Sequence, residues 1–168
     1  MRKSKLKLKG KVTVTVFDEH GNVKQKIENH NIVTTQGDAY IADILSNSPT
    51  RTKITQTSGY IPVGTNWTGV NPKNNTWVNT QTGSAQALAS GYPRIKGSWG
   101  GSDANVLQFR AIYAAGSLNA TITEAAITSH STSGSNNSCL AYAQISPAAV
   151  VTTSDSLQID WEITFLGT

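Results

Sequence analysis

The sequence predicts an all-β protein, an antiparallel β-sandwich or jelly-roll-like barrel with one short helix near residues 37–46. Only 14% of its 168 residues are charged, and Thr, Ser, Asn and Gly are abundant, a mixture that favours short strands joined by polar turns. Several segments also alternate apolar with polar residues, which is the period of a strand. A chain of this length needs only one core.

The first expected element is a β-hairpin. "VTVTV" alternates valine with threonine, and "DEHGNV" then supplies a turn before "VKQKIE". The helix is expected next, because apolar residues between Ala39 and Leu45 recur at spacings of three and four and Pro49 lies just past them.

Strand signals return at Gly59. In the last of these segments, apolar residues from Leu157 to Phe165 occupy every second position, as in a sheet with one buried and one wet face. Trp161 is therefore predicted to lie in the core. After the first segment, a polar passage runs to about Ser84. The predicted strand segments are "GYIPV", "ALASGYPRIKGSW", "NVLQFRAIYAA", "NATITEAAIT", "SCLAYAQIS" and "DSLQIDWEITF".

Positive charge is concentrated at the start of the chain. Residues 1–26 hold eight Lys or Arg against two acids, whereas residues 27–168 hold six against eight. We expect residues 1–11 to form a basic arm or an edge-strand extension, and residues 12–168 to form a single β-sandwich domain. The side chains that would dock on a partner are Arg2, Lys3, Lys5, Lys7, Lys9 and Lys11.

The same lysines have a second interpretation. "KLKLKGK" has the period of a strand, and lysines on an exposed edge discourage pairing with other sheets. Edge protection and partner docking are equally favoured by this pattern, and nucleic-acid binding is disfavoured against both.

No pattern in the sequence predicts catalysis. His20, His30 and His130 share no metal-ligand spacing, and the Gly-rich "GSWGGSD" lacks the lysine and the helix of a phosphate-binding loop. Cys139 lies in an alternating segment and is predicted to be a small core residue rather than a nucleophile. We therefore expect no enzyme activity, no cofactor and no metal site.

The acids late in the chain are expected to have structural roles. Glu124 interrupts a segment of apolar and small residues, so we expect it to be partly buried and paired with Arg110 or Arg94 in a salt bridge. Asp160 and Glu162 lie two apart on the polar face of the last strand, where an ordinary solvated pair is favoured over a catalytic one.

Three tryptophans, Trp67, Trp77 and Trp99, lie among Asn, Thr and Gly. This composition is shared by carbohydrate-binding surfaces, where aromatic faces stack on sugar rings, and by loops held down by one buried ring. Buried rings are the commoner case and are favoured here. A ligand-facing role for the three rings, with a surface glycan as the ligand, stays open.

The sequence also bears on location. No apolar run approaches the roughly 18 residues that span a bilayer, and "MRKSKLKLKGK" lacks the apolar segment of a signal peptide. We therefore expect a protein that folds in the cytoplasm and does not enter a membrane.

The order of motifs resembles small virion structural proteins of tailed bacteriophages. The matching pieces are a "GNV" turn, the "HNIVTTQGDAYIADIL" segment, a "VGT" turn, an "ITEAAI" strand and the closing "LQIDWEITF". The chain departs from that pattern where "VGTN" replaces "VGTG" and "ITEAAI" replaces "ITEAGL".

The resemblance implies a non-enzymatic component of a head, tail, fibre or baseplate. It implies location in the virion after folding in the host cytoplasm, other capsid or tail subunits as partners, and a homo-oligomer. A carbohydrate-binding or host-receptor-binding module is the alternative. A hydrolase has the weakest support, because no nucleophile with a matching base can be named.

Overall fold

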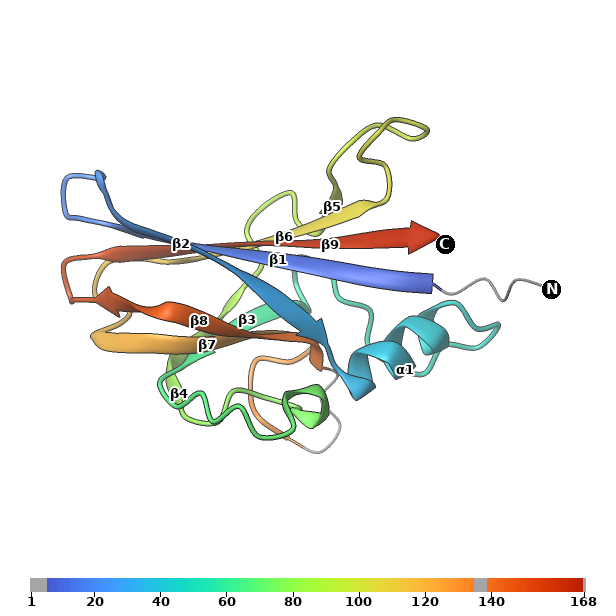
Figure 1. The fold of residues 1–168 in the computed structure, drawn as a ribbon, viewed down its shortest axis with the longest axis horizontal. Helices are drawn as coiled ribbons and strands as arrows, with labels where there is room; N and C mark the ends of the chain where they lie inside the picture. The colour runs from blue at the N-terminus through green and yellow to red at the C-terminus, as the bar shows by residue number, and fades with distance from the viewer. Residues whose placement is uncertain (1–5, 135–138, 168) are drawn as a thin grey trace.

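The computed structural model describes residues 6–134 and 139–167, and it shows a mostly antiparallel β-structure with one α-helix (Figure 1). This confirms the predicted all-β fold. The elements are β1 (Leu6–Phe17), β2 (Val23–Val33), α1 (Thr35–Ile44), β3 (Tyr60–Gly64), the 3-10 helix η1 (Pro72–Asn74), β4 (Gln81–Ala87), β5 (Arg94–Ile95), β6 (Val106–Tyr113), β7 (Ala120–Thr128), β8 (Cys139–Val151) and β9 (Ser156–Gly167).

The nine strands form one sheet that curls into a half-barrel, in the order β4-β3-β7-β8-β2-β1-β9-β6-β5. In Figure 1, β1, β9 and β6 lie in the upper layer, β8, β7 and β3 lie in the lower layer, and β2 crosses between them. β2 pairs with β1 as far as His30 and then with β8 from Asn31 to Val33. This change of partner carries the sheet from one layer to the other.

A second connection links the layers on the opposite side. After β4, the N–H of Leu88 donates to the carbonyl of Gly59 at 3.0 Å, and the N–H of Ala89 donates to the carbonyl of Arg110 at 2.8 Å. The buried Tyr113 hydroxyl donates to the Ile61 carbonyl at 2.6 Å, from β6 to β3. These bonds hold the two layers together where no strand joins them.

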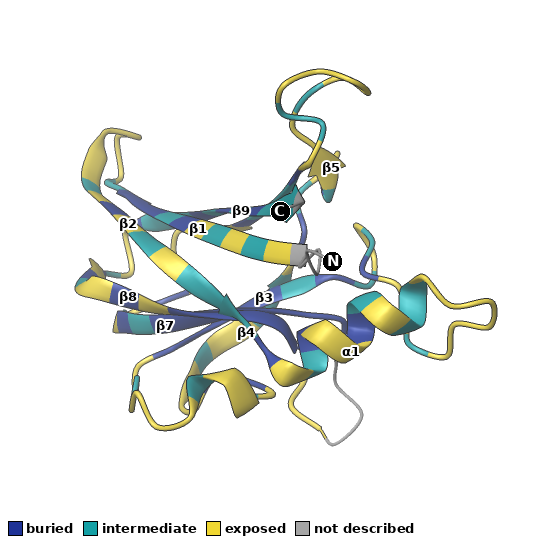
Figure 2. Ribbon diagram, turned by 45° about the vertical axis from the view of Figure 1, so that its right-hand side comes forward, coloured by how far each residue is buried: buried dark blue, intermediate teal, exposed yellow. Residues whose placement is uncertain are grey.

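The core fills the space between the layers and follows the alternation in the sequence. Val12, Val14 and Val16 of β1 are fully buried, and in β9 the apolar positions from Leu157 to Ile163 are buried as predicted (Figure 2). Trp161 has no exposed surface, which confirms its predicted place in the core. The half-barrel therefore has one continuous apolar interior.

Helix α1 begins two residues before the predicted range and packs against β8. Thr34 is its N-cap and accepts the N–H of Gly37 at 2.9 Å, while its hydroxyl donates to the Cys139 carbonyl. A Cβ at Gly37 would lie 2.1 Å from the Leu140 carbonyl oxygen. Glycine therefore allows the close approach of helix to strand.

The predicted strands differ from the structure in one region. The structure has β4 at residues 81–87, partly within the polar passage, and reduces the segment from Ala87 to Trp99 to the two-residue β5. β4 lies at the edge of the sheet, and none of its seven residues is buried. Because no face of β4 enters the core, its sequence does not alternate apolar with polar residues and gave no strand signal. Pro93 and nearby glycines interrupt the segment that was predicted as a strand.

The core position of Trp161 has a measurable consequence. Trp161→Ala is expected to lower the free energy of unfolding by about 4 kcal/mol, because it leaves a large cavity between the layers. Ile112→Ala is a matched control in β6, since Ile112 is 49% exposed, and its effect is expected to stay within about 0.5 kcal/mol. Denaturant titrations followed by far-UV circular dichroism measure both, and equal losses would contradict the assigned inner face.

Candidate functional site

One end of the half-barrel brings together the start of β1, the end of β9 and helix α1. Figure 1 shows the start of β1 and the end of β9 side by side at this end, with α1 below them. Residues Lys7 and Lys9 of the predicted docking set lie here and are exposed. Lys11 is paired with Glu28 at 2.9 Å. Arg2, Lys3 and Lys5 lie outside the described residues.

Residues 6–11 are the first half of β1, continuous with the strand that enters the core. They pair with β9 throughout, from Leu6↔Gly167 to Lys11↔Glu162, but pairing with β2 begins only at Lys11↔His30. Within the described ranges, Leu6–Gly10 therefore has a strand on one side only. Figure 2 shows exposed and partly buried residues alternating along this stretch.

An apolar cavity of about 290 Å³ lies at the same end. Its walls come from α1, β6 and β9, and several of its lining side chains are partly exposed, so it opens to solvent. Leu45, at the end of the helix, is 80% exposed. Its apolar lining includes Ile41, Ile44, Leu107, Ile163 and Phe165, and Lys53 is the one charged residue among those that line it.

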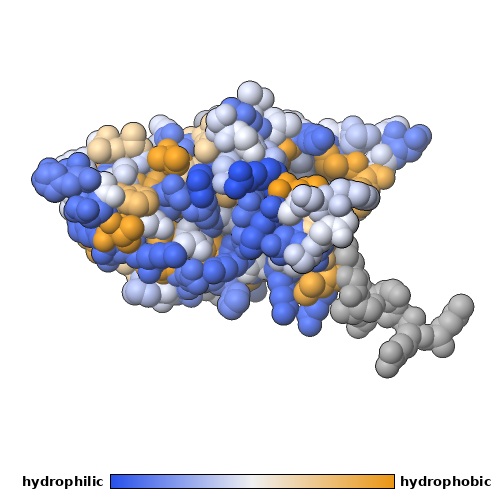
Figure 3. All heavy atoms as spheres, turned by 90° about the horizontal axis from the view of Figure 1, so that it is seen from above, coloured by the Kyte–Doolittle hydropathy of each residue, from blue (hydrophilic) through white to orange (hydrophobic). Residues whose placement is uncertain are grey.

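The surface shows the same juxtaposition. Figure 3 shows hydrophobic atoms reaching the surface toward the right of the view, with hydrophilic atoms around them. An apolar opening beside β9, whose neighbouring strand β1 carries the exposed Lys7 and Lys9 on its outer face, suits a partner segment that is itself partly apolar and negatively charged.

The tryptophans do not form one surface. Trp77 is buried and its Nε1 donates to Gln81 at 3.0 Å, while Trp67 stacks on Tyr142 with ring centroids 4.9 Å apart. Both rings therefore pack the loop between β3 and β4 onto the sheet, which is the role that the sequence favoured for them. Trp99 differs, since it is 94% exposed in the loop between β5 and β6.

Glu124 has a different partner from the one predicted. Its carboxylate is fully buried and accepts the backbone N–H groups of Asn79 at 3.0 Å and Thr80 at 3.2 Å, as well as the Tyr142 hydroxyl. Burial and the adjacent carboxylate raise the pKa of Tyr142. The buried carboxylate anchors the β3–β4 loop.

The predicted salt bridge of Glu124 with Arg110 or Arg94 is wrong. Arg110 donates to Asp160 at 2.6 Å, and Arg94 donates to Gln108 at 3.1 Å. Glu124 lies on β7, in the other layer from β6, which explains why these cations cannot reach it. The sequence showed that the carboxylate is unusual but not which loop would fold over it.

The polar face of β9 contacts its neighbours on the sheet. Asp160 accepts from Arg110, and Glu162 accepts from Gln108 at 2.8 Å and lies 3.3 Å from Lys96. Both acids are partly exposed. They form ordinary cross-strand pairs on the sheet surface.

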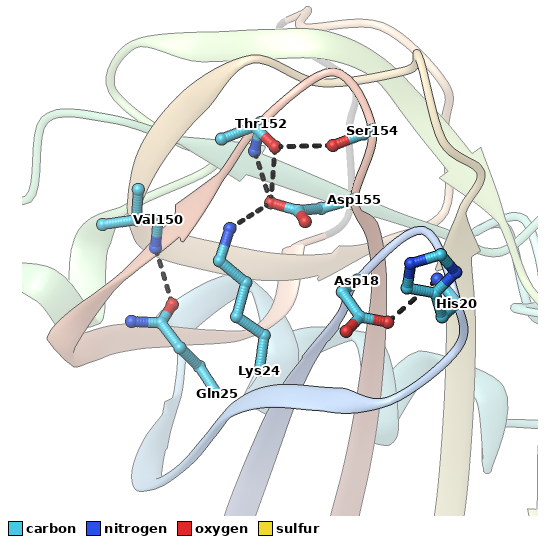
Figure 4. Close-up of polar contacts among 8 residues, drawn as sticks. All are labelled: Asp18, His20, Lys24, Gln25, Val150, Thr152, Ser154 and Asp155. Carbon is cyan, nitrogen blue, oxygen red and sulfur yellow. Dashed lines mark hydrogen bonds and ion pairs between the residues drawn. The ribbon is translucent and has the colours of Figure 1, made fainter.

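The end of the half-barrel away from the cavity is held by another buried carboxylate. Asp155, in the turn between β8 and β9, accepts Lys24 at 2.8 Å and the N–H and hydroxyl of Thr152, each at 2.8 Å. Figure 4 shows Lys24 reaching across from β2 to this turn. The Lys24 ammonium, with help from Thr152, lowers the pKa of Asp155 to about 2.

Cys139 is fully buried in β8, which confirms its predicted core position, and burial raises the pKa of its thiol to about 12. Among the described residues, no group of three or more His, Cys, Asp or Glu side chains is placed to hold a metal ion. No described helix has the length and apolar character needed to cross a membrane.

The apolar cavity was not predicted from the sequence. Ile41, Ile44 and Phe165 carry only the ordinary apolar signal of a helix and a strand, and their spacing gives no sign of an opening between the two elements. The one partial indication of an apolar surface here is Leu45, which is the last apolar residue before the polar "SNSPT" and is exposed in the structure.

Comparison of the chain with protein-family models, curated proteins and solved structures gives no significant match. The assignment of a role therefore depends on the geometry of this site and on the sequence motifs.

Loss of the buried carboxylate should release the β3–β4 loop. Glu124→Ala is expected to lower the free energy of unfolding by about 3 kcal/mol, because several buried donors lose their acceptor. Hydrogen exchange at the amides of Asn79 and Thr80 is expected to speed up. Glu19→Ala, at an exposed turn position, is the control. Unchanged stability and exchange in Glu124→Ala would show that the loop is held by its tryptophans alone.

The Asp155 contact predicts an acid limit to stability. Because the folded pKa, about 2, lies below the usual value of 3.8, the contribution of Asp155 is complete above about pH 5 and is lost as the pH falls toward 2. The difference in thermal midpoint between the protein and Asp155→Asn is therefore expected to shrink from pH 6 to pH 2 in roughly this window. Lys24→Met should weaken the effect, and a constant difference would contradict it.

Proposed function

We propose that this chain is a non-enzymatic structural protein of a tailed-phage virion, which docks on a capsid or tail lattice as a decoration protein or as a fibre or baseplate component. The observation that supports it best is that the first half of β1, with its exposed lysines, and an open apolar cavity lie at the same end of the half-barrel. This end presents both charge and apolar surface to a neighbouring subunit.

The roles of the acids agree with a structural protein. Nine of the ten Asp and Glu residues of the chain contact a cation, an amide or a hydroxyl, and most of these contacts hold a turn, a loop or a pair of strands. The tenth, the exposed Glu19, lies 3.6 Å from the His20 ring. Most of the carboxylates are thus engaged in maintaining the scaffold. Rigid scaffolds suit repetitive assemblies, in which many modest contacts add up to firm attachment.

The proposal has a direct test in purified particles. Virions banded on a density gradient from cultures that carry the gene are expected to contain the chain in many copies, counted by quantitative mass spectrometry of its peptides. The purified chain is also expected to form homo-oligomers, measured by analytical ultracentrifugation. A chain that is abundant in the lysate but missing from the particles would overturn the proposal.

A carbohydrate-binding role is the second candidate, and the 94% exposed Trp99 favours it. The loop that carries this ring also forms a shallow hollow with Gly100, Gly101, Ser102 and Asn105. Aromatic rings exposed beside polar groups are the usual platform for a sugar ring. An adhesive surface of this kind is compatible with a place on the outside of a virion.

Trp99 therefore gives a separate prediction. On a glycan array, the chain is expected to bind a defined set of sugars, and Trp99→Ala is expected to weaken that binding at least about tenfold, in line with the loss of one stacked ring. Trp67→Ala is the control, because Trp67 stacks on the protein's own Tyr142. Absence of any array signal would remove this candidate and leave the virion proposal unaffected.

A further inference from the structure

The open side of Leu6–Gly10 carries strand backbone that is not paired with any described strand. In antiparallel pairs, the N–H and C=O of one residue point to the same side, and successive residues alternate. Phe165 donates its N–H to Asn105 at 2.9 Å, on the β6 side, so its neighbour Thr164 points toward β1 and meets Lys9. Leu8 and Gly10 must therefore direct their backbone groups away from β9.

A second contact confirms this direction. The Gly10 carbonyl lies 3.4 Å from Nδ1 of His30, on the β2 side of β1. Beyond this point β2 leaves β1 for β8, and no other described strand takes its place beside Leu8. The backbone of Leu8 thus faces a gap in the sheet where the two strands diverge.

Asn31 marks the point of divergence. Its amide lies directly over Gly10, where a Cβ would come 1.4 Å from Oδ1, and both amide atoms are buried without a hydrogen-bond partner among the described residues. The Asn31 side chain therefore fills the inner face at Gly10, and the open edge lies nearer the start of β1, at Leu8.

The two faces of this stretch have opposite character. Leu8 lies on the inner face, where it packs against the same core as Ile41, Ile44 and Phe165. Lys7 and Lys9 lie on the outer face and are exposed. A strand added here would therefore place alternate side chains in an apolar and in a positively charged environment.

We propose that the open edge of β1 binds an extended segment of a partner protein, in which acidic residues alternate with apolar ones. The segment adds a strand beside Leu6–Gly10, with its acids facing Lys7 and Lys9 and its apolar side chains facing the cavity end of the core. A second copy of β1 is a poor occupant, because its own lysines would face Lys7 and Lys9. This inference rests on the proposed docking role and names the chemistry of the partner.

The test uses the full chain and a fluorescent peptide of about nine residues in which Glu alternates with Val, a length that covers one strand. Fluorescence anisotropy is expected to give a dissociation constant of about 10–100 µM that weakens as salt is raised. A control peptide has the same composition with its glutamates grouped at one end, and it is expected to bind at least about tenfold more weakly.

Two pairs of variants locate the binding. Lys7→Glu combined with Lys9→Glu is expected to weaken binding at least about tenfold, whereas Lys26→Glu, an exposed lysine of β2, should leave it unchanged. Leu8→Pro removes an N–H that faces the gap but none that pairs with β9, so the chain should fold and lose the peptide. Leu8→Ala keeps that N–H and should retain part of the affinity.

Backbone protection gives a readout that does not depend on any variant. In the wild-type chain, the peptide is expected to slow hydrogen exchange at the amides of Leu8 and Gly10. Equal binding of the grouped peptide, or protection elsewhere in the chain, would overturn the inference. Concentration-dependent protection of Leu8 without peptide would show instead that a second copy occupies the edge. A chain found in virions that binds neither peptide would overturn this inference alone, leaving the virion proposal intact.

Discussion

The structure depends on the change of partner along β2. Backbone groups in a strand need hydrogen-bond partners on both sides, and one sheet can enclose a core only if it curls or is covered. β2 takes part in both layers of the curled sheet, because it pairs with β1 from Val23 to His30 and with β8 from Asn31 to Val33. The continuous sheet thereby becomes two facing layers. The same change leaves the start of β1 without a second neighbour, so the candidate site is a direct result of how the core is enclosed.

Three carboxylates, of which those of Glu124 and Asp155 are buried, fix segments that the sheet itself does not hold. Glu124 gathers the backbone of a long loop on one layer, and Asp155 ties the β8–β9 turn to β2. Asp43, at the end of α1, accepts the N–H groups of Thr50 and Arg51 and so fixes the chain as it leaves the helix. In each case one carboxyl group accepts several hydrogen bonds and so fixes the segment that donates them. The β3–β4 loop, which is rich in Asn, Thr and Gly, is held by Glu124 together with the packed rings of Trp67 and Trp77.

Periodicity predicted the fold class, the first hairpin, the helix and the core face of β9. These predictions succeeded because an element with one buried face has apolar residues at the period of a strand or a helix. β4 was missed because a polar edge strand has no buried face to reveal it. The partners of Glu124 were missed for another reason, since they lie on a loop 45 and 44 residues away in the chain that folds over the strand. The lysines of β1 were identified, but the cavity beside them arises only when helix and strand meet in space.

The buried thiol of Cys139 has a practical consequence for experiments on this chain. It is the only cysteine, and it is fully enclosed and stays protonated at neutral pH. Maleimide dyes and spin labels react with exposed thiolates, so the native residue does not need to be removed before a new cysteine is introduced at a surface position. Distances between labelled copies in an assembled particle then become accessible to spectroscopy on an otherwise unaltered scaffold.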